Sequence, residues 1–217
     1  MKKMIFKILL GLTGGLLLLA AAFAGMMFVL TKPSEGPRIP HYSSPRTALL
    51  VVDIQEDYTG ASAKKPYKDG PRILAATNEL LGREPKGDLE VVYIQNVIDN
   101  AFIRFLAGGV NAPGAAGTEM DHRLMQAGGA PTFQKHRSDA FTNPALDVYL
   151  RAHQVDHLII VGLDAAYCVN ATARGALNRG YKVTLATRGI ATESGTSISS
   201  LAERWRRLGA EVVEMPF

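Results

Sequence analysis

Three residues in this sequence have side chains that can carry out chemistry, and each lies at or just after the end of a short apolar segment. Asp53 and Lys135 each fall at the end of a short apolar segment, and Cys168, the one cysteine among 217 residues, follows another such segment closely. A thiol is a nucleophile, a carboxylate can accept its proton, and an ammonium group stabilises the negative charge that results. The set is therefore a candidate for nucleophilic catalysis by Cys168; taken singly, an aspartate at a strand end usually caps a loop and a lysine is usually solvated.

Cys168 lies where a strand is expected to give way to a helix. The run "HLIIVG" (157–162) is apolar and ends in glycine, as a buried strand does, and Val169, Ala173 and Leu177 then recur at helical spacing. The first turn of a helix presents unpaired N–H groups and a partial positive charge, so we expect this position to lower the pKa of the thiol. The alternative is a small buried core residue, because free cysteine is among the most buried residue types.

Six short segments with strand character alternate with helical patterns from residue 47 onward. The predicted strands are 47–54, 89–95, 132–135, 157–162, 181–186 and 210–215, and the predicted helices are 72–84, 143–154, 168–180 and 197–209. The first and fourth strands lack alternation between apolar and polar residues, so they suit a parallel sheet that is covered on both faces. The predicted fold class is α/β, a three-layer αβα sandwich with a mostly parallel sheet of about six strands. Such sheets bind ligands at the carboxyl ends of their strands, where Asp53, Lys135 and Cys168 fall.

Three segments of the chain resemble a known family. These are "ALLVVDIQEDY" (48–58), "FQKHRSDAF" (133–141) and "VGLDAAYCVNATARGALNRGYKV" (161–183), which look like the signature blocks of the isochorismatase-like cysteine hydrolases. That family includes nicotinamidases, N-carbamoylsarcosine amidase and ureidoacrylate amidohydrolases. The resemblance covers about residues 47–217, and the blocks are specific in combination because their order, spacing and strand context agree.

The resemblance implies that Asp53, Lys135 and Cys168 act together as a catalytic triad. Asp53 takes the proton of Cys168, the thiolate attacks a carbonyl carbon of a small-molecule substrate, and Lys135 holds Asp53 ionised and oriented. An amide or ureido carbon–nitrogen bond breaks, and water then hydrolyses a thioester intermediate. No cofactor is expected.

Four further residues are candidates for contacts with the substrate or its oxyanion: Leu163, Asp164, Tyr167 and Gln55. The resemblance implies a cis peptide bond between Leu163 and Asp164. Two positions depart from the family pattern, because Asp164 stands where a small residue is usual and Ala165 where threonine is usual. We expect an acidic side chain beside the nucleophile to alter the pocket.

Two other functions remain open. The isochorismatase branch of the same family cleaves a vinyl ether with an acidic residue and needs no thiol, so the presence of Cys168 favours the amidase branch. A membrane-tethered binding module that kept the fold and lost catalysis is the second alternative, which the departures at Asp164 and Ala165 permit. A nucleotide-binding sheet is disfavoured, because neither GxGxxG nor GxxxxGK[ST] follows the first strand.

No metal ion is expected. Nicotinamidases carry an Asp/His metal site after the second strand, but the corresponding region here reads "NVIDNAFIRF" (96–105) and contains no histidine. His153 and His157 are four residues apart but straddle a helix-to-strand connection, so they do not share a helix face.

The first thirty residues predict a membrane anchor. The basic segment "MKKMIFK" precedes 23 uncharged residues, Ile8–Leu30, and a helix needs about 20 such residues to span a bilayer. The three lysines favour a single-pass protein with its N-terminus inside and its catalytic domain outside the cytoplasm. The alternative is a signal peptide cleaved near Ala24, which yields a secreted or periplasmic protein.

Between anchor and domain, residues 31–46 read "TKPSEGPRIPHYSSPR" and hold four prolines without apolar periodicity. Such a composition predicts a semi-extended spacer. The predicted organisation is therefore an anchor over 1–30, a Pro-rich linker over 31–46 and a hydrolase domain over 47–217.

The positive charge of the chain lies in its N-terminal part. The whole chain carries +4 and residues 1–46 carry +5, so residues 47–217 carry −1 and show no basic stripe interleaved with aromatic residues. Nucleic acid is therefore not an expected partner, whereas a small-molecule substrate and a membrane, contacted through residues 8–30, are. Gly11 and Gly15 form a GxxxG pair, which leaves a homo-oligomer open.

Overall fold

The computed structural model describes residues 2–83 and 89–216 and gives side chains from residue 13 onward. The chain forms two compact units, Met1–Lys32 and Pro33–Phe217. The first unit is one helix, α1 (Lys2–Thr31). Its segment Thr13–Thr31 has a mean hydropathy of 2.1 and is not buried, so it is long and apolar enough to cross a membrane. A signal sequence near the start of a chain has the same properties, so the helix fits either predicted role.

The described part of the second unit contains a parallel sheet of six strands. They are β1 (Arg46–Val52), β2 (Leu89–Asn96), β3 (Thr132–Lys135), β4 (Val155–Gly162), β5 (Lys182–Ile190) and β6 (Glu211–Val213). The strand order is β3-β2-β1-β4-β5-β6, and each neighbouring pair is parallel. This sheet confirms the predicted α/β class.

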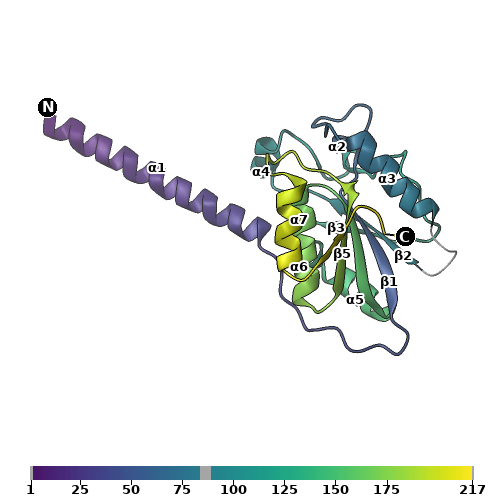
Figure 1. Cartoon of the computed structure of the whole chain (residues 1–217). Helices are drawn as coiled ribbons and strands as arrows, with labels where there is room; N and C mark the ends of the chain where they lie inside the picture. The colour runs from purple at the N-terminus through teal and green to yellow at the C-terminus, as the bar shows by residue number, and fades with distance from the viewer. Residues whose placement is uncertain (1, 84–88, 217) are drawn as a thin grey trace. The chain divides into compact units, whose positions relative to one another are not determined.

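Helices cover both faces of the sheet, as Figure 1 shows. The α-helices are α2 (Glu56–Thr59), α3 (Gly70–Gly82), α4 (Ala101–Leu106), α5 (Pro144–Ala152), α6 (Asn170–Asn178) and α7 (Ile198–Arg207). Two 3-10 turns, η1 (Ala116–Thr118) and η2 (Ala140–Thr142), and one π-helical turn, η3 (Ala165–Val169), join them.

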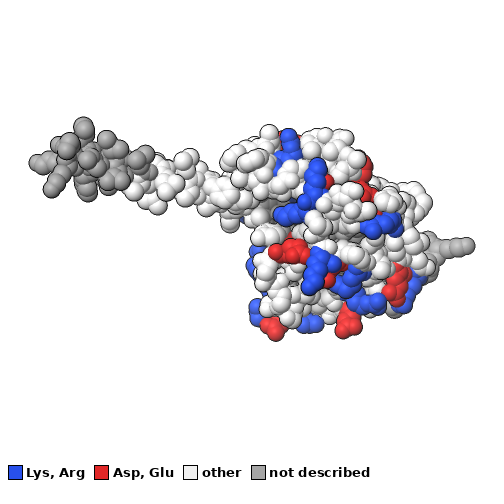
Figure 2. All heavy atoms as spheres, turned by 90° about the horizontal axis from the view of Figure 1, so that it is seen from above, with Lys and Arg blue, Asp and Glu red and all other residues white. Residues whose placement is uncertain are grey.

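Two separate cores hold the layers together. On one face Leu49 of β1 shares a core with Ile73 of α3, and on the other Leu50 shares a core with Ala173 of α6 and Trp205 of α7. Successive residues of β1 point to opposite faces and from Ala48 on are all buried, which explains why this strand lacks alternation in the sequence. On the molecular face drawn in Figure 2, basic and acidic side chains are interspersed.

Residues 33–45, which we call the strap, are not the free spacer that their prolines suggest. They form no helix or strand, as expected, but they lie along the domain. The Ile39 N–H donates to Arg179 O at 2.8 Å, the Ile39 side chain packs against the core beside α6, and the Ser34 N–H donates to Asp139. By its packing the second compact unit begins at Pro33 and so includes the segment predicted as a linker.

The end of β4 approaches β1 more closely than a side chain allows. Gly162 has a φ of 121°, and a Cβ at this position would stand 1.9 Å from the carbonyl oxygen of Val52. The N–H of Leu163 donates to the same oxygen at 3.0 Å. Glycine therefore lets the chain that leads to Cys168 pass directly beside the residue that precedes Asp53.

We expect Gly162→Ala to destabilise the domain by about 1–3 kcal/mol, because the added methyl group must push the β1 backbone aside. Gly82→Ala is the matched control, since a Cβ there meets nothing within 4 Å. Within a helix this change is neutral or stabilises by about 0.5–1 kcal/mol. Urea unfolding of both variants measures the difference, and equal effects would contradict a required glycine at 162.

Candidate active site

The three residues proposed from the sequence to be catalytic meet at the carboxyl edge of the sheet. Asp53 follows β1 with a φ of 57°, in the left-handed region that non-glycine residues rarely adopt. Lys135 ends β3, and Cys168 lies in η3, after β4. Strand β2 sets the spacing between β1 and β3, because the Asp53 N–H donates to Ile94 O at 2.9 Å and Lys135 is in register with Asn96.

The ammonium group of Lys135 contacts both of the other side chains. Its Nζ lies 2.9 Å from Asp53 Oδ2 and 3.2 Å from Cys168 Sγ. Lys135 and Asp53 are only 1% and 2% exposed, whereas Cys168 is partly exposed. The Lys135 ammonium can therefore stabilise a negative charge on either the Asp53 carboxylate or the Cys168 sulfur.

Burial controls the protonation of the three groups. It raises the pKa of the Asp53 carboxyl, and the Lys135 ammonium opposes this shift. For Lys135 burial disfavours the charged form, but Asp53 and Cys168 outweigh it and raise the pKa of the ammonium group. Because the carboxylate and the ammonium are in contact, we describe Asp53 and Lys135 as a buried ion pair.

The sequence argument for a lowered thiol pKa does not hold. Exclusion of water raises the pKa of the Cys168 thiol to about 12, and although Lys135 opposes the shift, Asp53 adds to it. The start of a helix is thus outweighed by burial and by a neighbouring carboxylate. At neutral pH the site holds a thiol and not a thiolate.

Asp164 is a buried carboxylate that ties the turn of Cys168 to the segment after β5. Its Oδ1 accepts from the Ala166 N–H at 2.7 Å and the Thr192 hydroxyl at 3.1 Å. Its Oδ2 accepts from the Glu193 N–H at 2.8 Å and the Tyr67 hydroxyl at 3.3 Å. Four donors occupy the carboxylate, so Asp164 shapes the turn and its side chain is not offered to a substrate.

The other three residues proposed for substrate or oxyanion contacts lie in different environments. Leu163 is buried, its N–H is engaged by Val52, and the peptide bond that follows it is cis, as the resemblance implies. Gln55 is fully buried, and its side chain both donates to Asn96 O at 3.0 Å and accepts from Asn96 N–H at 2.9 Å. Gln55 therefore joins the ends of β1 and β2. Tyr167 is 51% exposed beside the nucleophile, which is where a substrate can reach it.

Two tyrosines that the sequence reasoning did not select complete the surroundings of the thiol. Tyr58 and Tyr67 stack edge to face with ring centroids 5.6 Å apart. Burial raises the pKa of both phenols, and the charges of Asp53 at Tyr58 and Asp164 at Tyr67 raise it further. Both are therefore neutral hydroxyl groups.

A family model described as the isochorismatase domain matches residues 47–216. The chain belongs to this family. The isochorismatase-family assignment and the hydrolase class predicted from the sequence are confirmed.

Relatives of this isochorismatase-family chain are themselves hydrolases. Streptothricin hydrolase from Streptomyces noursei is 31% identical over 203 residues, which cover 88% of this chain and 75% of that protein. A second protein of that name from the same organism is 32% identical, and this chain spans 62% of its length. The ureidoacrylate amidohydrolase RutB of Acinetobacter baylyi is 27% identical over 59% of this chain and 64% of that protein.

Solved structures share the fold. N-carbamoylsarcosine amidase from Thermoplasma acidophilum superposes with a TM-score of 0.68 at 25% identity, covering 77% of this chain and 95% of that one. Pyrazinamidase of Pyrococcus horikoshii, solved in complex with zinc, gives a TM-score of 0.70 at 23% identity, covering 79% and 100%. The second likeness concerns the fold alone.

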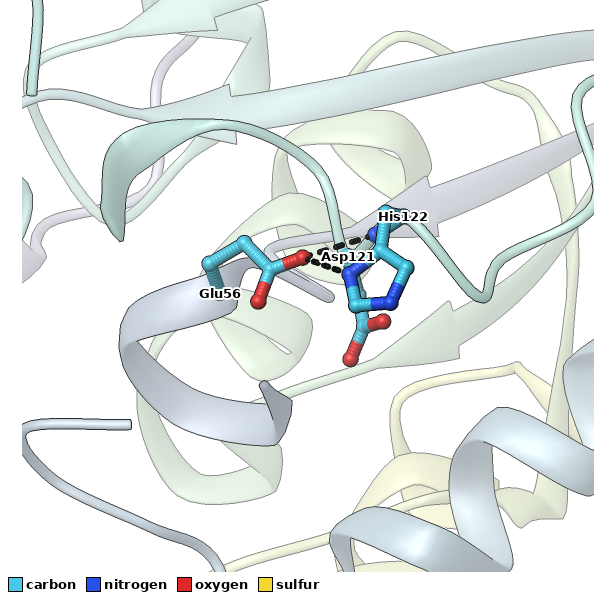
Figure 3. Close-up of side chains that lie close together, drawn as sticks. All are labelled: Glu56, Asp121 and His122. Carbon is cyan, nitrogen blue, oxygen red and sulfur yellow. Dashed lines mark hydrogen bonds and ion pairs between the residues drawn. The ribbon is translucent and has the colours of Figure 1, made fainter. Parts of the chain in front are cut away.

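Among the described residues, Glu56, Asp121 and His122 offer ligand atoms within 4.8 Å of one another (Figure 3). Glu56 Oε1 contacts His122 Nδ1 at 2.6 Å, but among the residues drawn in Figure 3 no hydrogen bond or ion pair reaches the Asp121 carboxylate. Arg123 holds the Asp121 carboxylate instead, with Nε 3.0 Å from Oδ1 and Nη2 2.7 Å from Oδ2. A guanidinium already neutralises this carboxylate, so the three residues do not fit a divalent cation.

The charges around Cys168 predict opposite effects of two substitutions on its reactivity. Asp53→Asn removes the negative charge that raises the thiol pKa, so alkylation at pH 7–8 should become faster even though the proposed base is lost. Lys135→Met removes the cation and should make alkylation slower. Intact mass measured against time of iodoacetamide treatment reports on Cys168 alone, because the chain has one cysteine.

In the unmodified protein the alkylation rate should keep rising above pH 8, because the thiol titrates with a pKa of about 12. Circular dichroism of each variant controls for folding. A plateau of the rate below pH 8, or slower alkylation of Asp53→Asn than of the unmodified protein, would contradict this description of the site.

Proposed function

We propose that this domain hydrolyses an amide or ureido carbon–nitrogen bond of a small molecule, with Cys168 as nucleophile, Asp53 as base and Lys135 as the neighbouring cation. The observation that carries the proposal is the contact of the Lys135 ammonium with both the Asp53 carboxylate and the Cys168 sulfur, at 2.9 and 3.2 Å. Carboxylate, cation and thiol stand at the edge of the sheet where α/β folds bind ligands.

In the first half of the reaction the thiol proton moves to Asp53. The Oδ2 atom is held by Lys135, whereas Oδ1 is buried without a hydrogen-bond partner among the described residues, which makes Oδ1 the acceptor we propose. The thiolate then adds to the carbonyl carbon of the substrate. Lys135 faces one anion before the transfer and one anion after it, so the transfer requires no change in the charge around the cation.

Backbone N–H groups of the turn are proposed to stabilise the oxyanion. The N–H groups of Ala165, Tyr167 and Val169 donate to protein carbonyls, and that of Ala166 donates to a carboxylate. We therefore propose that the backbone N–H of Cys168, which belongs to the same residue as the nucleophilic sulfur, donates to the oxyanion.

The second half returns the enzyme to its starting state. The tetrahedral adduct breaks its carbon–nitrogen bond, and the protonated Asp53 gives its proton to the leaving nitrogen, so that ammonia or an amine departs and a thioester remains. Water then attacks the thioester while Asp53 accepts its proton. The carbon–sulfur bond breaks, Cys168 is reprotonated by Asp53, and a carboxylic or carbamic acid leaves.

The relatives support this class of substrate. Ureidoacrylate amidohydrolase and N-carbamoylsarcosine amidase act, by their names, on amide or ureido nitrogen. The presence of a thiol beside the carboxylate supports the same choice over cleavage of a vinyl ether, because an acid-catalysed cleavage needs no nucleophilic sulfur.

We expect Cys168→Ala to lower hydrolysis by about 10³-fold or more, with stability changed by less than about 1 kcal/mol, because a partly exposed nucleophile contributes little packing. Released ammonia across a panel of small amides and ureido compounds measures the activity, and mass spectrometry detects the thioester. Cys168→Ser is the matched variant of similar size and should also lack the thioester. Retention of full activity by Cys168→Ala would contradict the proposal.

We further propose that α1 is an uncleaved membrane anchor, with the hydrolase domain outside the cytoplasm. The support is the apolar segment Thr13–Thr31 and the basic residues that precede it.

If α1 is an uncleaved anchor, the chain should remain in the membrane fraction after washing with carbonate. Its intact mass should still include the N-terminal segment. Leu17→Lys combined with Leu18→Lys should release it, because each lysine at the centre of a spanning helix costs about 3 kcal/mol of insertion free energy. Protease added to intact cells should digest the domain. Recovery of a soluble chain that starts near Gly25 would instead support a signal peptide.

A further inference from the structure

The strap binds to the domain through one buried carboxylate. Asp139 is fully buried, and its Oδ2 accepts from both the backbone N–H and the hydroxyl of Ser34, each at 2.6 Å. Its Oδ1 accepts from the Phe141 N–H at 2.8 Å. Within the described residues this carboxylate accepts three hydrogen bonds, and two of them come from one residue of the strap, which lies outside the family-matched region that begins at residue 47.

Asp139 lies between the segment that carries Lys135 and helix α6, which follows Cys168. It follows Lys135 by four residues, and its carboxylate packs so closely on α6 that a Cβ at Gly175 would stand 2.3 Å from Oδ2. The next residue, Ala140, donates its N–H to the Thr172 hydroxyl of α6 at 3.1 Å. The segment after Lys135 is therefore clamped to the helix that follows Cys168.

A second contact secures the strap to the same helix. Arg179, at the end of α6, is 5% exposed and donates to Ser34 O at 3.2 Å and to Glu35 O at 2.8 Å. Its guanidinium lies against Gly36, where a Cβ would stand 2.6 Å from Nε. A buried cation and a buried carboxylate thus hold the strap on either side of Ser34.

We propose that Ser34 is a positioning residue for the active site: by satisfying Asp139 it holds the segment after Lys135 against α6 and so fixes the Lys135 ammonium beside the Cys168 sulfur. The role in turnover rests on the proposed function. The strap is then part of the catalytic scaffold and not only a tether between anchor and domain.

The physical reason lies in the cost of an unsatisfied buried carboxylate. Burial raises the pKa of Asp139, and the bonds from Ser34 are the foremost interactions that oppose this. Without the Ser34 hydroxyl, Oδ2 keeps one N–H donor in place of two donors, so the buried carboxylate takes up a proton or moves toward water more readily. Gly175 leaves no space for a shift toward α6, so a shift must displace the segment that carries Lys135.

The test uses the full chain with Ser34→Ala, with Ser34→Thr as the conservative variant that restores the hydroxyl, and with Ser44→Ala as a control elsewhere in the strap. Gly36→Ala is a second variant, which displaces the Arg179 guanidinium. We expect Ser34→Ala and Gly36→Ala to lower kcat about tenfold with KM little changed, and Ser34→Thr and Ser44→Ala to retain it.

A second readout needs no substrate. Alkylation of Cys168 by iodoacetamide across pH 7–10 should slow in Ser34→Ala and Gly36→Ala, because the thiol loses the nearby cation, and should be unchanged in the other two. Unchanged alkylation and kcat in Ser34→Ala and Gly36→Ala, with only a lower Tm, would overturn the proposal. If the unmodified protein hydrolyses no compound of the panel, the proposed function fails, but the alkylation profiles still decide the role of Ser34.

Discussion

A buried ion pair is the interaction on which the rest of this site depends. Asp53 and Lys135 are almost completely excluded from water, and such a pair is stable only when its geometry is good and no partner is removed. The parallel sheet supplies that geometry. Strand β2 lies between the strands that carry the two residues, so its register fixes how far apart they stand.

The pair also affects the protonation state of Cys168, the proposed nucleophile. Burial and the Asp53 charge keep Cys168 protonated, so the free enzyme does not expose a reactive thiolate. In the proposed mechanism, reactivity arises when the proton passes to Asp53, with Lys135 in contact with both groups. A thiol held in this way resists adventitious oxidation, because the thiolate is the species that oxidants and alkylating agents attack.

Residues outside the family-matched domain take part in the same arrangement. The strap contributes hydrogen bonds to a carboxylate that lies between the segment of Lys135 and the helix after Cys168. The family match begins at residue 47, so it leaves out the strap residues that make these contacts. The strap and the segment that carries Lys135 are therefore linked through Asp139, and the buried Arg179 adds a second contact between the strap and α6.

The sequence by itself determined the strands, the order of the elements and the three residue types of the site, because continuous apolar runs and block motifs are local properties. It did not determine the thiol pKa, since a helix start is visible in sequence whereas burial beside Asp53 is not. It likewise assigned Gln55 to the substrate and residues 31–46 to a spacer. Only the tertiary structure decided these points, because hydrogen bonds between Gln55 and Asn96, and between Ser34 and Asp139, join segments far apart in the chain. Composition and periodicity are local properties and do not indicate which distant residues form hydrogen bonds with one another.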